Sequence, residues 1–458
     1  MIADSDKQTS SYSPRACVAK MQHFAVLTSL LYRQVTNSPL RTRMSRQIVL
    51  DVSHLITRLT QPAPTGVDRV DLAYARYFVK DRRLSSCGTQ YGLFRPHVLM
   101  PSRVKFLVGS IEQQQAEDHL EEVLAESFGH PATTSSRNLN RLRADWSRRA
   151  TQWRFRTLHK WGAEVPKNAI YLNVAQHAFE HRRFFRWLDE RPDVIPVFFV
   201  HDLLPLDFPE FFPEGYRERF MRRVKTMQRA RAIITSTEYV AERIAYQYRK
   251  NGLAPVSIHV EPLASPLAGT NDVELFNQQN RPPYFVVIST IEPRKNHMLL
   301  INVWRTLISR SISPPKLVLV GKRGWENEQT LRELDAPELR QHIVRMPSLP
   351  PAHLKALLKN AVALLMPSFA EGYGLPIVEA LSLSVPVICS DIPVFREISR
   401  GKALLMSPID GMGWLRAIEA MASPKSLIRT EYANKAKEFG ATDWGAYFEN
   451  IEGFLATI

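Results

Sequence analysis

Two glutamates eight positions apart, Glu371 and Glu379, enclose a glycine-rich turn. An apolar run over residues 361–366 before them predicts a buried strand, and residues 377–383 predict a helix. Glycine permits a positive φ and close backbone approach, and the start of a helix attracts anions. We therefore predict a ligand with a central phosphate and hydroxyl-rich ends, such as a nucleotide-sugar. Between the glutamates lie Gly372, Tyr373, Gly374, Leu375 and Pro376.

Two adjacent cations, Arg294 and Lys295, follow a predicted strand over residues 284–289. Such a pair can neutralise a diphosphate, and arginine can bind it in a fork. Glu379, about one turn into its helix, can accept hydrogen bonds from a ribose diol. Glu371 then faces the sugar end of the ligand. We interpret both glutamates as groups that hold the ligand and not as an acid and a nucleophile.

A histidine and an aspartate, His201 and Asp202, follow a third apolar strand. The histidine could hydrogen-bond a sugar hydroxyl or the reacting centre, and the aspartate could orient the loop or contact an acceptor. A pair that only caps the turn is the simpler alternative. Closer to the N-terminus, Gly66 and Arg69 lie where a helix is predicted to begin after the strand over residues 48–52.

Together these motifs resemble the retaining glycosyltransferases of family 4, which have the GT-B fold. The Glu371–Glu379 spacing matches the family's Glu-x7-Glu signature, residues 289–297 match a second motif, and His201-Asp202 a third. The resemblance covers residues 46–458. Many members have two adjacent glycines where this chain has only Gly66, and a glycine where it has Ser384. We expect the serine to affect packing only.

The resemblance implies an α/β protein of two Rossmann-like domains that face each other across a cleft. It implies sugar transfer from a nucleotide-diphosphate donor with retention at the anomeric carbon. The residues it assigns to catalysis are His201, Arg294, Lys295 and Glu371, with Asp202 on the acceptor side. Those it assigns to donor binding are Gly66, Arg294, Lys295, Glu371, Gly372, Tyr373, Gly374, Leu375 and Glu379.

Donor and acceptor are less sharply defined by the sequence. The context of His201 resembles bacterial mannosyl- or rhamnosyltransferases of polysaccharide assembly, which favours GDP-mannose and a glycan or polyprenyl-linked acceptor. Between residues 46 and 458 no Asp-x-Asp motif occurs, so we expect neither a metal ion nor a cofactor at the site. A catalytically silent nucleotide-sugar-binding protein and a basic nucleic-acid-binding protein remain as alternatives.

The length of 458 residues predicts two domains. We expect a disordered leader or a mis-assigned start over 1–45, with Met44 as the alternative to Met1. An N-terminal acceptor domain over 46–265, a nucleotide-sugar domain over 270–430 and a returning helix within 431–458 should follow. Three widely spaced cysteines and no long apolar run favour a cytoplasmic protein.

A basic insertion interrupts the N-terminal half at residues 110–165. Within it, residues 137–161 alternate arginines with tryptophan, phenylalanine and leucine. This composition suits a charged helix packed on the core, or an amphipathic helix lying on an anionic membrane at the inner face of the plasma membrane. The net charge of +15 also suits anionic partners, but no nucleic-acid-binding motif accompanies it, so we expect no nucleic acid.

Overall fold

A computed structural model describes residues 46–59, 65–81, 87–90, 95–116, 164–267, 269–273, 283–311 and 313–458. The expected leader over 1–45 lies outside these ranges. So does most of the expected insertion, including residues 137–161. In the described part, no helix has the length and apolar character needed to cross a bilayer.

The first sheet has seven strands in the order β3-β2-β1-β4-β5-β6-β7. Every neighbouring pair is parallel except β2 with β3. Its strands are β1 (Ile48–Asp51), β2 (Cys87–Gln90), β3 (His97–Leu99), β4 (Ile170–Asn173), β5 (Ile195–Phe199), β6 (Ala232–Thr235) and β7 (Ser257–Val260).

The second sheet has six parallel strands in the order β10-β9-β8-β11-β12-β13. In each sheet the strand order reverses beside the first strand, which is where open α/β sheets bind ligands. Its strands are β8 (Tyr284–Ile288), β9 (Lys316–Val320), β10 (Ile343–Met346), β11 (Leu364–Met366), β12 (Val387–Ser390) and β13 (Leu404–Met406).

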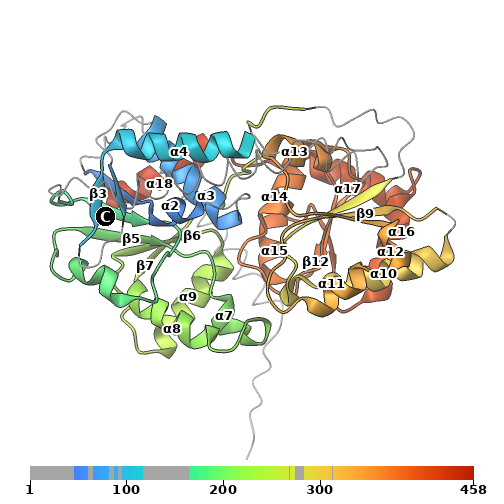
Figure 1. The fold of residues 1–458 in the computed structure, drawn as a ribbon, viewed down its shortest axis with the longest axis horizontal. Coiled ribbons are helices and arrows are strands. Elements are labelled where there is room, and N and C mark those ends of the chain that lie inside the picture. The colour runs from blue at the N-terminus through green and yellow to red at the C-terminus, as the bar shows by residue number, and fades with distance from the viewer. Residues whose placement is uncertain are drawn as a thin grey trace, which may run out of the picture. The chain divides into compact units, whose positions relative to one another are not determined.

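Helices flank both faces of each sheet (Figure 1). The first sheet and its helices form the N-terminal lobe, and the second sheet and its helices form the C-terminal lobe. The N-terminal lobe carries α2 (Ser53–Arg58), α3 (Gly66–Ala75), α4 (Pro101–Ala116), α7 (Leu204–Asp207), α8 (Tyr216–Met227) and α9 (Glu238–Lys250). The C-terminal lobe carries α10 (His297–Arg310), α11 (Glu328–Leu334), α12 (Pro337–Arg340), α13 (Pro351–Lys359), α14 (Leu375–Ser382), α15 (Pro393–Ser399), α16 (Gly411–Ala422) and α17 (Leu427–Lys437).

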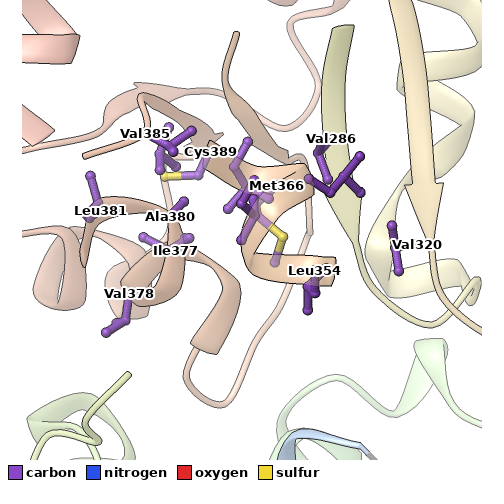
Figure 2. Close-up of a cluster of buried hydrophobic side chains, with 14 of the residues drawn as sticks. Val286, Val320, Leu354, Met366, Ile377, Val378, Ala380, Leu381, Val385 and Cys389 are labelled. Atoms are coloured by element: carbon purple, nitrogen blue, oxygen red, sulfur yellow. The ribbon is translucent and has the colours of Figure 1, made fainter. Parts of the chain in front are cut away.

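One face of the C-terminal sheet is closed by α14, whose apolar residues pack on the strands. Figure 2 shows Ile377 and Ala380 of this helix close to Met366 of β11 and Cys389 of β12. All four are at most 1% exposed. The buried face fixes the rotation of α14 about its axis and therefore the direction of its other side chains.

The last helix, α18 (Trp444–Thr457), packs against the N-terminal lobe. Its Tyr447 hydroxyl lies 2.7 Å from that of Tyr74, and Phe448 stacks on Tyr77 with ring centroids 4.2 Å apart. Figure 1 shows this red helix among the blue elements of that lobe. The last helix thus lies on the N-terminal lobe, although it follows the C-terminal lobe in the sequence.

The two parallel-sheet lobes confirm the predicted fold class. Ten apolar runs predict strands: residues 48–52, 169–173, 195–201, 232–236, 257–261, 284–289, 316–320, 342–346, 361–366 and 386–390. Each is observed within three residues of these bounds, but β2, β3 and β13 were missed. These three are short, of at most four residues, and β2 contains Gly88 and two polar residues. They are recognisable only by the strands they pair with.

Candidate active site

A cavity of about 440 Å³ opens between the two lobes and holds most of the predicted site residues. Two helices begin at it: Gly66 of α3 and Leu375 of α14 both line its wall. A Cβ atom added at Gly66 would lie 3.4 Å from Leu375 Cδ1, so the two helix starts are in contact. Both helix dipoles therefore favour an anion at the same place.

The predicted glycine turn connects β11 to α14 and requires both of its glycines. Gly374 has a φ of +111°, a conformation that side chains other than glycine rarely adopt. A Cβ atom on Gly372 would lie 2.7 Å from Asp202 Cβ, which belongs to the other lobe. The turn thus carries the site's backbone close to the N-terminal lobe. Tyr373, whose hydroxyl donates to the Leu263 carbonyl, also lines the cavity.

Glu371 lies at the centre of a charge cluster inside the C-terminal lobe. Arg294 Nη1 donates to its Oε2 at 2.8 Å, Ser368 Oγ donates to its Oε1 at 2.8 Å, and Lys295 Nζ also donates to Oε1. Both predicted phosphate-binding cations are therefore paired with Glu371, a pairing that the sequence did not indicate.

These cations determine the charge of Glu371. Burial opposes its ionisation, but Lys295 and Arg294 outweigh that effect and lower the pKa of Glu371 to about 2. Burial and the neighbouring Arg294 lower the pKa of Lys295. Oε1 already accepts two hydrogen bonds, whereas Oε2 accepts one, from Arg294, and keeps a free lone pair. The cluster can therefore accept a sugar hydroxyl at Glu371 while its cations face an incoming phosphate.

The loop before α10 holds this cluster in place. Asn296 has a left-handed φ of +55° and donates its side-chain amide to the carbonyls of Pro367 and Pro408. Glu292 forms an ion pair with Arg294 at 2.6 Å, and burial raises the pKa of Glu292. Both residues act on the loop's shape.

The predicted ribose binding requires a carboxylate that a ligand can reach, and the structure places Glu379 differently. It is fully buried, does not line the cavity, and forms an ion pair with Arg69 of α3. Arg69 does line the cavity. The sequence motif identified Arg69 only by its spacing from Gly66 and gave no sign of this partner, because the pair spans 310 positions.

His201 and Asp202 line the cavity from the N-terminal lobe. His201 Nε2 donates to the Val174 carbonyl at 2.8 Å, which leaves Nδ1 as an acceptor. Burial lowers the pKa of His201 to about 4, so the ring is neutral near pH 7. Asp202 Oδ1 accepts from the Leu204 N–H, and burial raises its pKa. A sugar hydroxyl could donate to the open histidine nitrogen.

A capping box fixes the start of α3. The Thr65 hydroxyl accepts from the Asp68 N–H, and the Asp68 carboxylate accepts from the Thr65 N–H at 2.6 Å. Asp68 also pairs with His54 at 2.6 Å and with Arg58 at 2.9 Å. These contacts hold Gly66 and Arg69 against the other lobe without a second glycine.

Several cavity residues were missed from the sequence. Trp325 donates its ring N–H to the Phe211 carbonyl of the other lobe at 3.0 Å, and Pro347 and Leu349 add apolar wall. They follow β9 and β10, and only their position after predicted parallel strands could have indicated them. Among the described residues, no group of three or more histidine, cysteine, aspartate or glutamate side chains could hold a metal ion.

Residues 271–438 match the family described as glycosyl transferases group 1. The chain is 30% identical over 251 residues to the serotype-specific mannosyltransferase WbdA of Escherichia coli, covering 50% of this chain and 31% of that protein. It is 28% identical over 223 residues to the O-antigen chain mannosyltransferase RfbU of Salmonella typhimurium, covering 48% and 59%. It thus spans less than two thirds of either relative.

Among solved structures, sucrose-phosphate synthase from Thermosynechococcus elongatus superposes with a TM-score of 0.57 at 14% identity. The superposition covers 90% of this chain and 98% of that one. At this identity the likeness concerns the fold alone, and both lobes share it. The predicted GT-B architecture is therefore confirmed for the described residues.

Proposed function

We propose that this chain, whose residues 271–438 match the group 1 glycosyl transferases, moves a hexose from a nucleotide-diphosphate sugar to a glycan or lipid-linked acceptor. The observation that carries the proposal is the cavity between the lobes. One wall holds Glu371 ionised between Arg294 and Lys295, and the other presents the open nitrogen of His201. The reaction would serve bacterial surface polysaccharide synthesis.

Mannose is the preferred sugar of the proposal and GDP the preferred nucleotide. Two relatives are named as mannosyltransferases, one of them of the O-antigen chain. The sequence around His201 favours the same sugar. We propose no cofactor for the reaction, because the nucleotide-sugar is itself a substrate.

In the proposed mechanism, the diphosphate lies at the two helix starts with Arg294 and Lys295 beside it. The acceptor hydroxyl attacks the anomeric carbon on the face from which the diphosphate leaves, and the departing phosphate oxygen takes its proton. Charge grows on that oxygen in the transition state, so the cations and helix dipoles stabilise it more than the ground state. Glu371 and His201 hold the sugar by its hydroxyls.

A screen of donor hydrolysis and transfer across UDP-, GDP- and dTDP-sugars tests the proposed function. We expect release of one nucleotide diphosphate above the others, with GDP-mannose the best donor. Binding of a nucleotide-sugar without any turnover, with or without glycan acceptors, would instead indicate a silent binding protein. Salt-dependent binding of random DNA without nucleotide-sugar binding would contradict the proposal altogether.

Arg294→Ala and Lys295→Ala test the leaving-group role. Each should raise the barrier by about 3 kcal/mol, because one preorganised charge contact is lost. Arg305→Ala and Lys435→Ala are matched controls, since their ion pairs with Glu333 and Glu431 lie on helices outside the charge cluster around Glu371. Initial rates with the best donor measure the effect. Near-normal turnover in both site variants would contradict the role.

Peripheral membrane contact through residues 137–161 is the remaining part of the proposal. The arginines and aromatic residues there suit an anionic lipid surface. Co-sedimentation with vesicles containing about a third anionic lipid, compared with neutral vesicles, would measure this membrane binding. Equal pelleting with both, or with neither, would favour packing of this segment on the protein.

A further inference from the structure

Arg69 lines the cavity from the N-terminal lobe and forms an ion pair with a residue of the C-terminal lobe. It lies on α3, its side chain is 16% exposed, and it pairs with the fully buried Glu379 of α14. An ion pair removed from water in this way persists only with close geometry, because both charges lose their hydration.

The pair satisfies one half of the carboxylate. Arg69 donates to Glu379 Oε1, whereas Oε2 is buried and accepts no hydrogen bond from the described residues. Buried acceptors without a donor are rare and costly. Glu379 follows Leu375 and Pro376 by four and three positions, and both of these line the cavity. Residues at this spacing share a helix face, so Glu379 lies on the same side of α14 as these two residues, behind the cavity wall that they line.

We infer that Arg69 is a positioning residue for the nucleotide: it holds Glu379 as the acceptor for the ribose hydroxyls, so the N-terminal lobe completes ribose recognition by the C-terminal lobe. This inference rests on the proposed function. Without the guanidinium, the buried carboxylate would lose its cationic partner and turn toward water. It would then accept hydrogen bonds from a ribose less well.

The arrangement couples donor binding to the contact between the lobes. Arg69 reaches Glu379 only while α3 and α14 lie together, so the joined lobes bind ribose better. By reciprocity, a bound ribose stabilises the joined lobes by the same factor. A ligand that lacks the ribose hydroxyls gains nothing from the pair.

Calorimetric titration with GDP and UDP, and with their 2′,3′-dideoxy counterparts, isolates this effect. The wild-type protein should prefer the ribose form of its nucleotide by about tenfold or more, the effect of one hydrogen bond to a charged group. Arg69→Ala should reduce this preference to below about threefold. It should also raise KM for the donor more than it lowers kcat. Arg69→Lys should retain most of the preference.

Two further variants separate the pair from general loosening. Glu379→Gln should lose the preference as well, and the double variant with Arg69→Ala should be no worse than either single one. Glu397→Gln removes a different contact between the lobes, where Glu397 accepts the N–H groups of Glu238 and Tyr239 at 2.7 and 3.1 Å. It should leave the ribose preference unchanged.

Three outcomes would overturn the inference. Equal weakening of ribose and dideoxy forms by Arg69→Ala would mean that Arg69 contacts the phosphates or base directly. A stronger preference in Arg69→Ala would mean that Arg69 competes with the ribose for Glu379. An equal loss in Glu397→Gln would assign the effect to lobe contact in general. Failure of the wild-type protein to bind any nucleotide would instead contradict the proposed function.

Discussion

Glu371 illustrates how single residues in this site depend on their neighbours. The carboxylate is buried, and it stays ionised only because Arg294 and Lys295 lie against it. Removing either cation would leave a buried charge less well compensated. The same residues therefore determine the charge of the site.

Asp71 presents the opposite case, a buried carboxyl group without a cation. It is 0% exposed, and neither of its oxygens has a hydrogen-bond partner among the described residues. Burial, together with Asp51 and Asp68, holds the pKa of Asp71 well above its ordinary value. The folded protein therefore binds this proton more tightly than the unfolded chain, and its stability falls as the pH rises above about 4.

We predict that Asp71→Asn raises the free energy of unfolding at pH 8 by about 1–3 kcal/mol, because the neutral amide removes the cost of burying a charge. At pH 4 the gain should be much smaller. Thermal unfolding of both proteins at the two pH values measures the difference. A lower melting temperature for the variant at pH 8 would contradict the prediction.

Ser384 adopts a backbone conformation that favours glycine. Its φ is +60° on an exposed turn after α14. The sequence suggested an effect on packing only, but the structure places the cost in the backbone. Ser384→Gly should raise the free energy of unfolding by about 0.5–1 kcal/mol. Ser384→Ala, the control in denaturant unfolding, should gain nothing, and an equal gain would locate the effect in the side chain.

At the scale of elements, the start of α14 depends on Gly374. A Cβ atom there would lie 2.8 Å from a ring carbon of Phe395 and 3.0 Å from Ile398, both in α15. The glycine thus permits both the positive φ and the contact between the two helices. The turn cannot be moved without moving α14.

Gly374→Ala should lower the free energy of unfolding by about 1–3 kcal/mol, because the alanine is strained at φ +111° and collides with α15. It should also weaken donor binding, since Leu375 and Pro376 line the cavity. Chemical unfolding and donor KM measure the two effects. Gly411→Ala is the control, because no atom lies within 4 Å of its added carbon. Unchanged KM in Gly374→Ala would separate the turn from the site.

At the scale of the whole molecule, the site exists only where the lobes meet. Gly372 touches Asp202, Trp325 donates to Phe211, and Phe369 stacks on Phe211 with ring centroids 5.5 Å apart. The returning helix α18 packs against the N-terminal lobe through Tyr447 and Phe448. Contacts between distant segments thus determine the width of the cavity.

Gly372→Ala should separate lobe contact from stability. The added carbon would lie 2.7 Å from Asp202 Cβ and 2.9 Å from the His201 carbonyl, so the lobes must shift apart. We expect a loss of kcat of about tenfold or more, since small misplacement of reacting groups is costly. The melting temperature should change by only a few degrees. A large fall in melting temperature with unchanged kcat would contradict this view.

Much of the fold followed from local patterns. Apolar runs such as residues 316–320 predicted buried parallel strands, and Gly374 with Pro376 marked the start of a helix. Trp444, Tyr447, Phe448, Ile451 and Phe454 stand at helical spacing, and α18 contains all of them. Strands β3 and β13 were missed because the apolar runs that contain them are shorter than the run over residues 361–366 that contains β11.

The amino-acid sequence by itself determined which residues we predict for the candidate site: the cation pair, the two glutamates, the glycine turn and the histidine–aspartate pair. Their types and their places after strands are local properties. Only the tertiary structure decided how they are partnered. It paired Glu371 with Arg294 and Lys295, and it buried Glu379 against Arg69, 310 positions away. The first pairing arises within the C-terminal lobe and the second from the packing of the two lobes, because contacts between residues distant in the sequence leave no periodic signal in the chain.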